Sequence, residues 1–283
     1  MTTTLRPDGP EEPLPGGGRT RSFAVCANGR PVGALCVTAH GGPAGLTGWI
    51  TRLEITEGRR RGRGTVAVLA AEEVLRGWGC TRVDVSIPEE CEAALRLASA
   101  LGYRERMRQM AKHLTEQPPP LPAGLTGRPI DAAAFPAWLA EEKRGYVDEL
   151  VGTGLSEQQA REKSEADHRA LLPDGPNTRD TALRFLVPAQ PADAEPLGSL
   201  WVQQGGRPGP DGDLAWVFSV EVAEHARGRG YGRALMHLAE RECLAADVHD
   251  LGLNVFSDNE VAIGLYTSLG YRITQRTFGK PLL

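Results

Sequence analysis

The feature of this sequence that most constrains its fold is an internal repeat. The pattern Arg-x-x-Gly-x-Gly occurs as RRRGRG at residues 59–64 and as RGRGYG at residues 227–232. A Leu-Gly-Tyr sequence follows each copy, and 38 residues separate its glycine from the last glycine of the motif. An offset of 168 residues therefore aligns the copies without a gap. A repeat of this length predicts two similar domains in one chain.

Length and further identities support the same division. The 283 residues exceed the usual single domain of about 100 to 200 residues. Residues 1–20 are rich in Pro, Gly and acidic residues, which is typical of a flexible tail. The consecutive prolines of TEQPPPLP favour an extended spacer. The identities at the common offset are Ala71 with Ala239, Glu72 with Glu240, Ala94 with Ala262, and Leu97 with Leu265. We expect a flexible tail at 1–20, a first domain at 21–115, a linker at 116–122 and a second domain at 123–283.

The expected elements follow a similar order in the two domains. Strand-like segments lead into the Arg/Gly motif, and a helix, a strand and another helix follow it. In the first domain, Asn28-Gly29 predicts a tight hairpin turn. The second domain has two additional helices, at residues 135–152 and 156–172, before its strands. The sequence therefore predicts an α/β (α+β) fold.

Composition and charge exclude several classes of function. The formal net charge is −4 and the pI is near 5.9, whereas nucleic-acid binding usually needs a basic surface. No segment approaches the roughly 18 apolar residues of a membrane span, and the N-terminus lacks a signal-like apolar stretch. The five cysteines lack the spacing of a zinc site. We expect a cytoplasmic protein with no metal, no nucleic-acid partner and no membrane partner.

The second Arg/Gly motif has the features of an anion site. A strand that ends in a glycine-rich turn and leads into a helix directs several backbone N–H groups toward one point, at the positive end of the helix dipole. Gly228, Gly230 and Gly232 allow close approach of the backbone. Arg227 and Arg233 add charge suited to a diphosphate. An Arg/Gly-rich surface turn is the alternative for the motif taken alone.

The sequences VEVAEHARGRGYGRALM and LNVFSDNEVAIGLYTSLGY resemble the GNAT superfamily of N-acetyltransferases, which use acetyl-coenzyme A. The resemblance covers residues 125–283 best. It implies tandem domains, each with a mixed, mostly antiparallel sheet flanked by helices. It also implies that the loop holds the coenzyme pyrophosphate and that the preceding strand pairs with the pantetheine arm. Many members carry Pro where this chain has Glu224.

The resemblance assigns residues to the coenzyme and to the chemistry. Those implied to bind the coenzyme are Val220, Val222, Arg227, Gly228, Arg229, Gly230, Tyr231, Gly232, Arg233, Asn254 and Asn259. Tyr266 matches the usual general acid toward the coenzyme sulfur, and Glu221 resembles the glutamate that serves as base. The alternatives are a packed aromatic for Tyr266, a solvated carboxylate for Glu221 and a helix N-cap for Asn259. His225 is a weaker candidate base.

The first copy lacks these groups. At the common offset, Ala98 stands in place of the tyrosine, and Ser86 and Cys91 stand in place of the two asparagines. Residues before the first strand are also too few for the two additional helices. We interpret the first copy as a degenerate domain with a scaffolding role.

The predicted function is transfer of an acetyl group from acetyl-CoA to a primary amine of a small molecule, by direct attack in the C-terminal domain of a monomer or homodimer. The alternative is a non-catalytic acyl-CoA sensor or scaffold. The candidate acceptor-wall residues are Trp138, Glu141, Glu142, Tyr146, Trp216 and Phe218. Carboxylates there suit a cationic amine, although a helix with this charge pattern is also typical of a solvated face.

Overall fold

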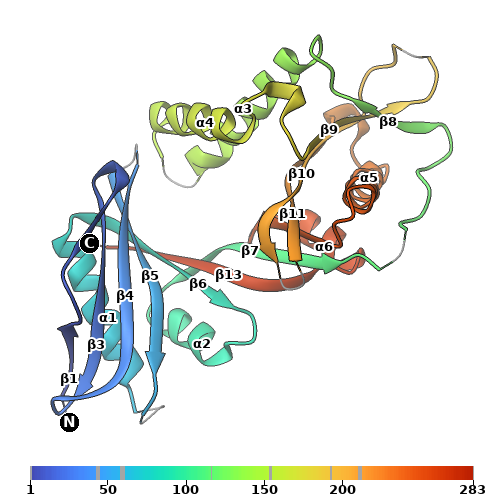
Figure 1. Cartoon of the computed structure of the whole chain (residues 1–283). Helices are drawn as coiled ribbons and strands as arrows, with labels where there is room; N and C mark the ends of the chain where they lie inside the picture. Colours follow the sequence, from blue (N-terminus) through green and yellow to red (C-terminus); the bar gives the residue numbers. More distant parts are fainter. Residues whose placement is uncertain are drawn as a thin grey trace. The chain divides into compact units, whose positions relative to one another are not determined.

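The computed structural model describes residues 2–42, 45–57, 61–115, 117–152, 155–191, 193–209 and 212–282 (Figure 1). Arg59 and Arg60 of the first Arg/Gly motif lie outside these residues. The strands are β1 (Thr3–Pro7), β2 (Glu12–Leu14), β3 (Gly18–Ala27), β4 (Arg30–Gly42), β5 (Gly45–Ile55), β6 (Cys80–Pro88), β7 (Arg104–His113), β8 (Leu125–Pro129), β9 (Thr181–Pro188), β10 (Gly198–Gly209), β11 (Gly212–Val222), β12 (Asp250–Phe256) and β13 (Arg272–Pro281). The α-helices are α1 (Arg63–Gly77), α2 (Glu92–Ala100), α3 (Phe135–Gly152), α4 (Glu157–Leu171), α5 (Tyr231–Ala245) and α6 (Glu260–Ser268).

The chain forms two compact units. Unit 1 contains residues 1–107, 153–163 and 275–283, and unit 2 contains residues 108–152 and 164–274. In unit 1 the strands lie in the order β1-β3-β4-β5-β6-β13, and in unit 2 they lie in the order β7-β12-β11-β10-β9-β8. The β5–β6 and β11–β12 pairs are parallel, whereas β3–β4, β4–β5, β9–β10 and β10–β11 are antiparallel. The expected mixed, mostly antiparallel sheets with flanking helices are confirmed.

The first twenty residues contain regular structure, contrary to the expected flexible tail. Strand β1 pairs with β3 in a register that places Leu5 opposite Val25, and β2 pairs with β3 through Leu14 and Gly18. Leu5 also packs against the apolar core of unit 1. Without this pairing, β3 would present an open edge of the sheet. The backbone of the first residues is ordered by hydrogen bonds to β3, which amino-acid composition does not predict.

The helices after each Arg/Gly motif are built on the same apolar spacing. In α1 the residues Ala67, Ala71 and Leu75 recur every fourth position and are fully buried. In α5 the residues at the same offset, Leu235, Ala239 and Cys243, are fully buried too. A four-residue recurrence puts side chains on one helix face. Each helix therefore covers one face of its own sheet.

The last strand of each sequence half completes the sheet of the other unit. Residues 275–281 of β13 pair antiparallel with β6, from Gln275 opposite Pro88 to Pro281 opposite Arg82. Phe278 of this strand is buried in the core of unit 1. Residues 108–113 of β7 belong to unit 2, where Met110 is buried in the core. The compact units therefore differ from the division of the sequence at residues 21–115 and 123–283.

A buried lysine–glutamate pair attaches each exchanged strand. In unit 1 the Lys280 ammonium lies 2.8 and 3.0 Å from the carboxylate oxygens of Glu72 on α1. In unit 2 Lys112 of β7 donates to Glu240 of α5 at 2.6 Å. The two glutamate side chains are 4% and 2% exposed. Because the pairs are related by the repeat offset, the exchange is reciprocal.

Replacing Lys280 with Met should leave the Glu72 carboxylate buried without its cation and lower the free energy of unfolding by about 3 kcal/mol. Adding Glu72→Met should restore much of the loss, because the double variant contains no uncompensated buried charge. Urea unfolding of wild type, single and double variants measures both effects. A Lys280→Met protein within about 0.5 kcal/mol of wild type would show that the pair does not hold the strand.

Candidate active site

The parallel pair at the centre of unit 2 separates part of the way along its length. The β11–β12 register runs from Leu214 opposite Asp250 to Val217 opposite Leu253, whereas β11 continues to Val222. On its other side, β11 contains a bulge at Phe218, since Trp201 pairs with Ser219 and the next pair joins positions 202 and 217. A bulge bends and twists a strand locally. Beyond it, residues 218–222 have no β12 partner in the described register, so this edge can pair with an extended ligand.

The Arg/Gly loop follows β11 and forms a set of outward backbone donors. Gly228 and Gly230 have φ angles of 77° and 82°, a region that favours glycine. Among the described backbone hydrogen bonds, Arg227 N–H donates to Glu224 and the next loop donors are the N–H groups of Arg233 and Ala234. The N–H groups of residues 228–232 are therefore available at the start of α5, which is an arrangement suited to an anion.

Helix α6, which carries Tyr266, lies against the first turn of α5. A Cβ atom on Gly232 would lie 3.1 Å from Leu265, so glycine permits the close contact between α5 and α6. Arg233 of α5 donates to Ser268 of α6 at 2.7 Å, which attaches the two helices to each other. Tyr266 is half-buried, its ring centroid lies 6.1 Å from that of Tyr271, and burial raises the pKa of its phenol. The phenol is thus protonated at neutral pH.

The two asparagines occupy different environments. Asn254 is exposed on β12, directly after the last residue paired with β11. The side chain of Asn259 accepts a hydrogen bond from Ala262 N–H at 3.1 Å and caps α6. Asn259 therefore fixes the start of the helix that carries Tyr266.

The two faces of β11 carry different groups. Val220 and Val222 pack against the core that contains α5. Glu221 is exposed on the opposite face, where Ser199 is its partner across the strand pair, and Ser219 lies opposite Trp201. Trp201 contacts Trp138 of α3, with ring centroids 6.0 Å apart. The face that carries Glu221 is therefore the one lined by aromatic residues of α3. His225 is exposed in the short turn Glu224–Ala226.

Three carboxyl groups gather on this face. Glu142 of α3 is half-buried, and burial, partly offset by a hydrogen bond with Ser219 and reinforced by Glu221 and Glu149, raises its pKa to about 7. Burial and Glu221 also raise the pKa of Glu149. The sequence pointed to Glu142 only as a wall residue and missed Glu149. Their seven-residue spacing, which is two helical turns, is the signal that places both on one face.

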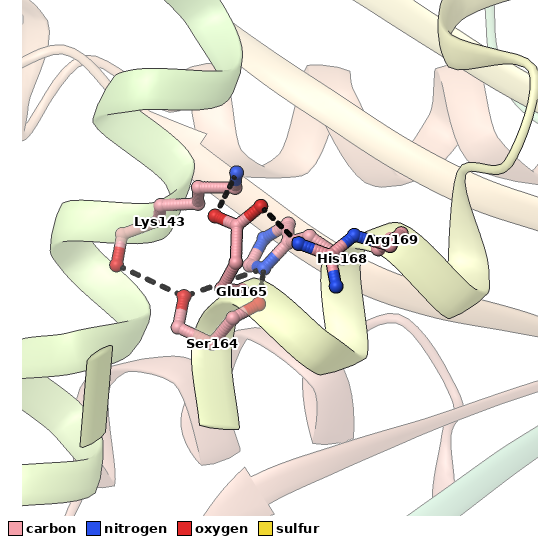
Figure 2. Close-up of polar contacts among 5 residues, drawn as sticks. All are labelled: Lys143, Ser164, Glu165, His168 and Arg169. Atoms are coloured by element: carbon pink, nitrogen blue, oxygen red, sulfur yellow. Dashed lines mark hydrogen bonds and ion pairs between the residues drawn. The ribbon is translucent and has the colours of Figure 1, made fainter. Parts of the chain in front are cut away.

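A polar network attaches α4 to α3 (Figure 2). Lys143 of α3 contacts the Glu165 carboxylate at 2.6 Å, and Ser164 donates to the Lys143 carbonyl at 3.4 Å. The buried His168 has Nδ1 2.8 Å from the Ser164 carbonyl, so this nitrogen carries the hydrogen. Burial lowers the pKa of His168, which keeps the ring neutral. Its ring centroid lies 5.6 Å from that of Trp201. The network holds α3 and α4 together beside the face of β11 that carries Glu221.

Unit 1 has the same framework with different chemistry. The β5–β6 register ends at Trp49 opposite Asp84, and Gly62, with φ of 74°, precedes α1. Arg63, however, is 9% exposed and donates to the Glu57 carbonyl at 2.7 Å. Ala98, at the position equivalent to Tyr266, is buried in the core. Unit 1 therefore has no phenol at the equivalent position.

The described ranges were searched for helices that could cross a membrane and for side chains that could hold a metal ion. No helix there is long and apolar enough to cross a membrane. Likewise, no group of three or more His, Cys, Asp or Glu side chains in these ranges could hold a metal ion.

Known proteins of similar sequence are acetyltransferases. The uncharacterized N-acetyltransferase YdgE of Bacillus subtilis is 26% identical over 149 residues, which is 52% of this chain and 92% of that protein. A mycothiol acetyltransferase of Paenarthrobacter aurescens is 29% identical, over 64% of this chain and 54% of its own length. Another, from Frankia casuarinae, is 28% identical over 93% of this chain and 76% of its own length.

Solved structures share the fold along nearly the whole chain. A GCN5-related N-acetyltransferase from Sphaerobacter thermophilus has a TM-score of 0.60 at 20% identity, covering 92% of this chain and 80% of that one. A tandem GNAT protein from the clavulanic acid biosynthesis pathway has a TM-score of 0.52 at 18% identity, with 96% and 85% covered. The sequence profile of the Acetyltransferase (GNAT) family matches twice, at residues 5–103 and 146–271. The chain therefore belongs to the GNAT family of acetyltransferases and carries two copies of its domain in tandem.

Proposed function

We propose that the protein is an acetyl-CoA-dependent N-acetyltransferase acting on a primary amine of a small molecule, with its working site in the C-terminal domain. The observation that carries the proposal is the combination in unit 2 of an anion-binding loop, an open strand edge and a protonated phenol. The relative described as an uncharacterized N-acetyltransferase supports transfer to nitrogen, and the mycothiol acetyltransferases support a small-molecule acceptor. We infer a cytoplasmic monomer or homodimer.

The residues of unit 2 fit coenzyme A. The N–H groups of residues 228–232 would hold the pyrophosphate, with charge from Arg227, Arg229 and Arg233. The main chain of residues 220–222 would pair with the amides of the pantetheine arm, because this edge of β11 lies beyond the described β12 register. Asn254 stands at the same opening. The coenzyme supplies an acetyl thioester, whose carbonyl is open to attack by an amine.

The chain supplies the proton transfers. An ammonium acceptor must lose a proton before attack, and the departing thiolate is helped by gaining one. Tyr266, protonated and carried on the helix that packs against α5, would donate to the sulfur. Glu221, on the face of β11 covered by α3, would receive the acceptor proton together with its carboxyl neighbours. Unit 1, with Ala98 in place of the tyrosine, would serve as a scaffold.

Replacing Tyr266 with Phe should lower kcat by about 100-fold while leaving the KM for acetyl-CoA nearly unchanged, because the phenol acts on the leaving group. Since burial raises the pKa of Tyr266, wild-type activity should show no loss on the alkaline side up to about pH 9. Thiol release with a panel of primary amines measures both.

The matched control is Tyr103→Phe in the first copy, which should retain activity within about threefold of wild type. An unchanged rate in Tyr266→Phe would remove that residue from the mechanism. Tight coenzyme binding without thiol release from any amine would instead support a sensor.

Replacing Gly230 with Ala should weaken coenzyme A binding by about tenfold or more, because an L-residue is strained at a φ of 82° and the loop would shift. Gly62→Ala changes the equivalent position of the first copy, where φ is 74°. If only unit 2 holds the coenzyme, Gly62→Ala leaves the affinity unchanged in calorimetry. Equal losses in the two variants would show that both copies bind.

A further inference from the structure

Helix α3 brings a carboxyl group to the strand that holds the proposed base. The Ser219 hydroxyl of β11 lies near the Glu142 carboxyl and lowers its pKa, and Ser219 lies two residues before Glu221 on the same strand face. Trp201, opposite Ser219 on β10, contacts Trp138 of α3 and Phe218 of β11, with ring centroids 6.0 and 4.7 Å apart. The carboxyl group of Glu142 therefore lies beside Glu221 on an aromatic-lined face.

The charges on this face are uncompensated within the described residues. Some other acidic residues of α3 and α4 have cationic partners, since Glu141 pairs with Arg144 and Glu165 with Lys143. None of the ion pairs formed by the described residues involves Glu142, Glu149 or Glu221. The Oε2 atom of Glu142 is buried and makes no hydrogen bond to the described residues. A carboxyl group placed for stability alone would normally have a partner. These observations favour a cationic ligand at this position.

We propose that Glu142 is a catalytic residue, the group that takes the proton from the acceptor ammonium, and that Glu221 is a positioning residue that acts through it. This inference rests on the proposed function and specifies its base. Glu221 of β11 and Glu149 of α3 are the charged groups that act on Glu142, and both oppose a further negative charge there. Their repulsion makes Glu142 a better proton acceptor than an isolated carboxylate.

The two side chains and the substrates account for every proton in the reaction. The ammonium R–NH₃⁺ gives one proton to the Glu142 carboxylate and becomes R–NH₂. The nitrogen lone pair forms the C–N bond at the thioester carbonyl, and the C–S bond breaks with its electron pair on sulfur. The sulfur takes a proton from Tyr266, which regains one from the nitrogen as the amide forms. Glu142 then releases its proton to solvent, so the net products are the amide, the thiol and one proton.

The direct test compares two nucleophiles in Glu142→Gln. With 1,4-diaminobutane, which is an ammonium at neutral pH, kcat should fall by about 100-fold or more, because a general base is worth about that factor. With hydroxylamine, which is uncharged at neutral pH, the rate should stay within about threefold of wild type, because no ammonium proton must be removed. The KM for acetyl-CoA should not change, which shows that the variant is folded.

The pH profile separates the roles of the two glutamates. A base must be deprotonated, and the Glu142 pKa is about 7, so wild-type kcat should decline as the pH falls below about 7. Glu221→Gln removes a like charge, lowers the Glu142 pKa and shifts this decline to lower pH. Asp148 is an exposed residue of α3, the helix that carries Glu142, and Asp148→Asn should leave kcat and its pH profile as in wild type.

Each outcome discriminates between the proposals. Loss of the diaminobutane rate in Glu221→Gln, with Glu142→Gln behaving as wild type, would make Glu221 the base and overturn this inference while the proposed function stands. Equal losses with both nucleophiles in Glu142→Gln would also overturn it, because they indicate a structural role. Absence of thiol release by wild type with either nucleophile, despite coenzyme binding, would overturn the proposed function and this inference together.

Discussion

The buried lysine–glutamate pairs that attach the exchanged strands are the constraint on which both units depend. Lys280 reaches Glu72 on α1, and Lys112 reaches Glu240 on α5. Each glutamate lies on the helix that follows an Arg/Gly motif, so the pairs fix the exchanged strand relative to that helix. A charge buried without its partner is costly, so each pair stabilises the attachment of its strand to its helix. Each half of the sequence therefore needs the other to complete its sheet.

The site in unit 2 follows from the way β11 leaves its neighbours. The bulge at Phe218 and the end of pairing at Leu253 open one edge of the strand, while its two faces stay covered by different helices. On one side α5 and α6 present the loop donors and Tyr266. On the other, α3 presents Glu142 against Ser219. The separation of β11 from β12 thus lets groups from opposite faces of the sheet act at β11. Unit 1 keeps the equivalent separation of β5 from β6 but has no phenol at the position of Tyr266.

Much of the framework could be predicted from local patterns. The hairpin turn at Asn28-Gly29, the helix after each glycine loop and the N-cap at Asn259 depend on interactions within a few residues. The prediction of a flexible tail at residues 1–20 was wrong, because the pairing of β1 with β3 joins residues some twenty positions apart. The exchange of β7 and β13 was missed because both strands follow a Leu-Gly-Tyr sequence. The sequence therefore does not show which sheet each strand joins.

The sequence by itself determined the tandem repeat, the family and the position of the Arg/Gly loop, because these depend on the spacing of glycines and apolar residues along the chain. Only the tertiary structure decided which sheet each last strand completes and which carboxyl groups gather beside Glu221. Glu142 lies 79 positions from Glu221 in the sequence, and its raised pKa results from burial and from charges on another element. Such a property depends on distances through space, which the order of residues does not specify.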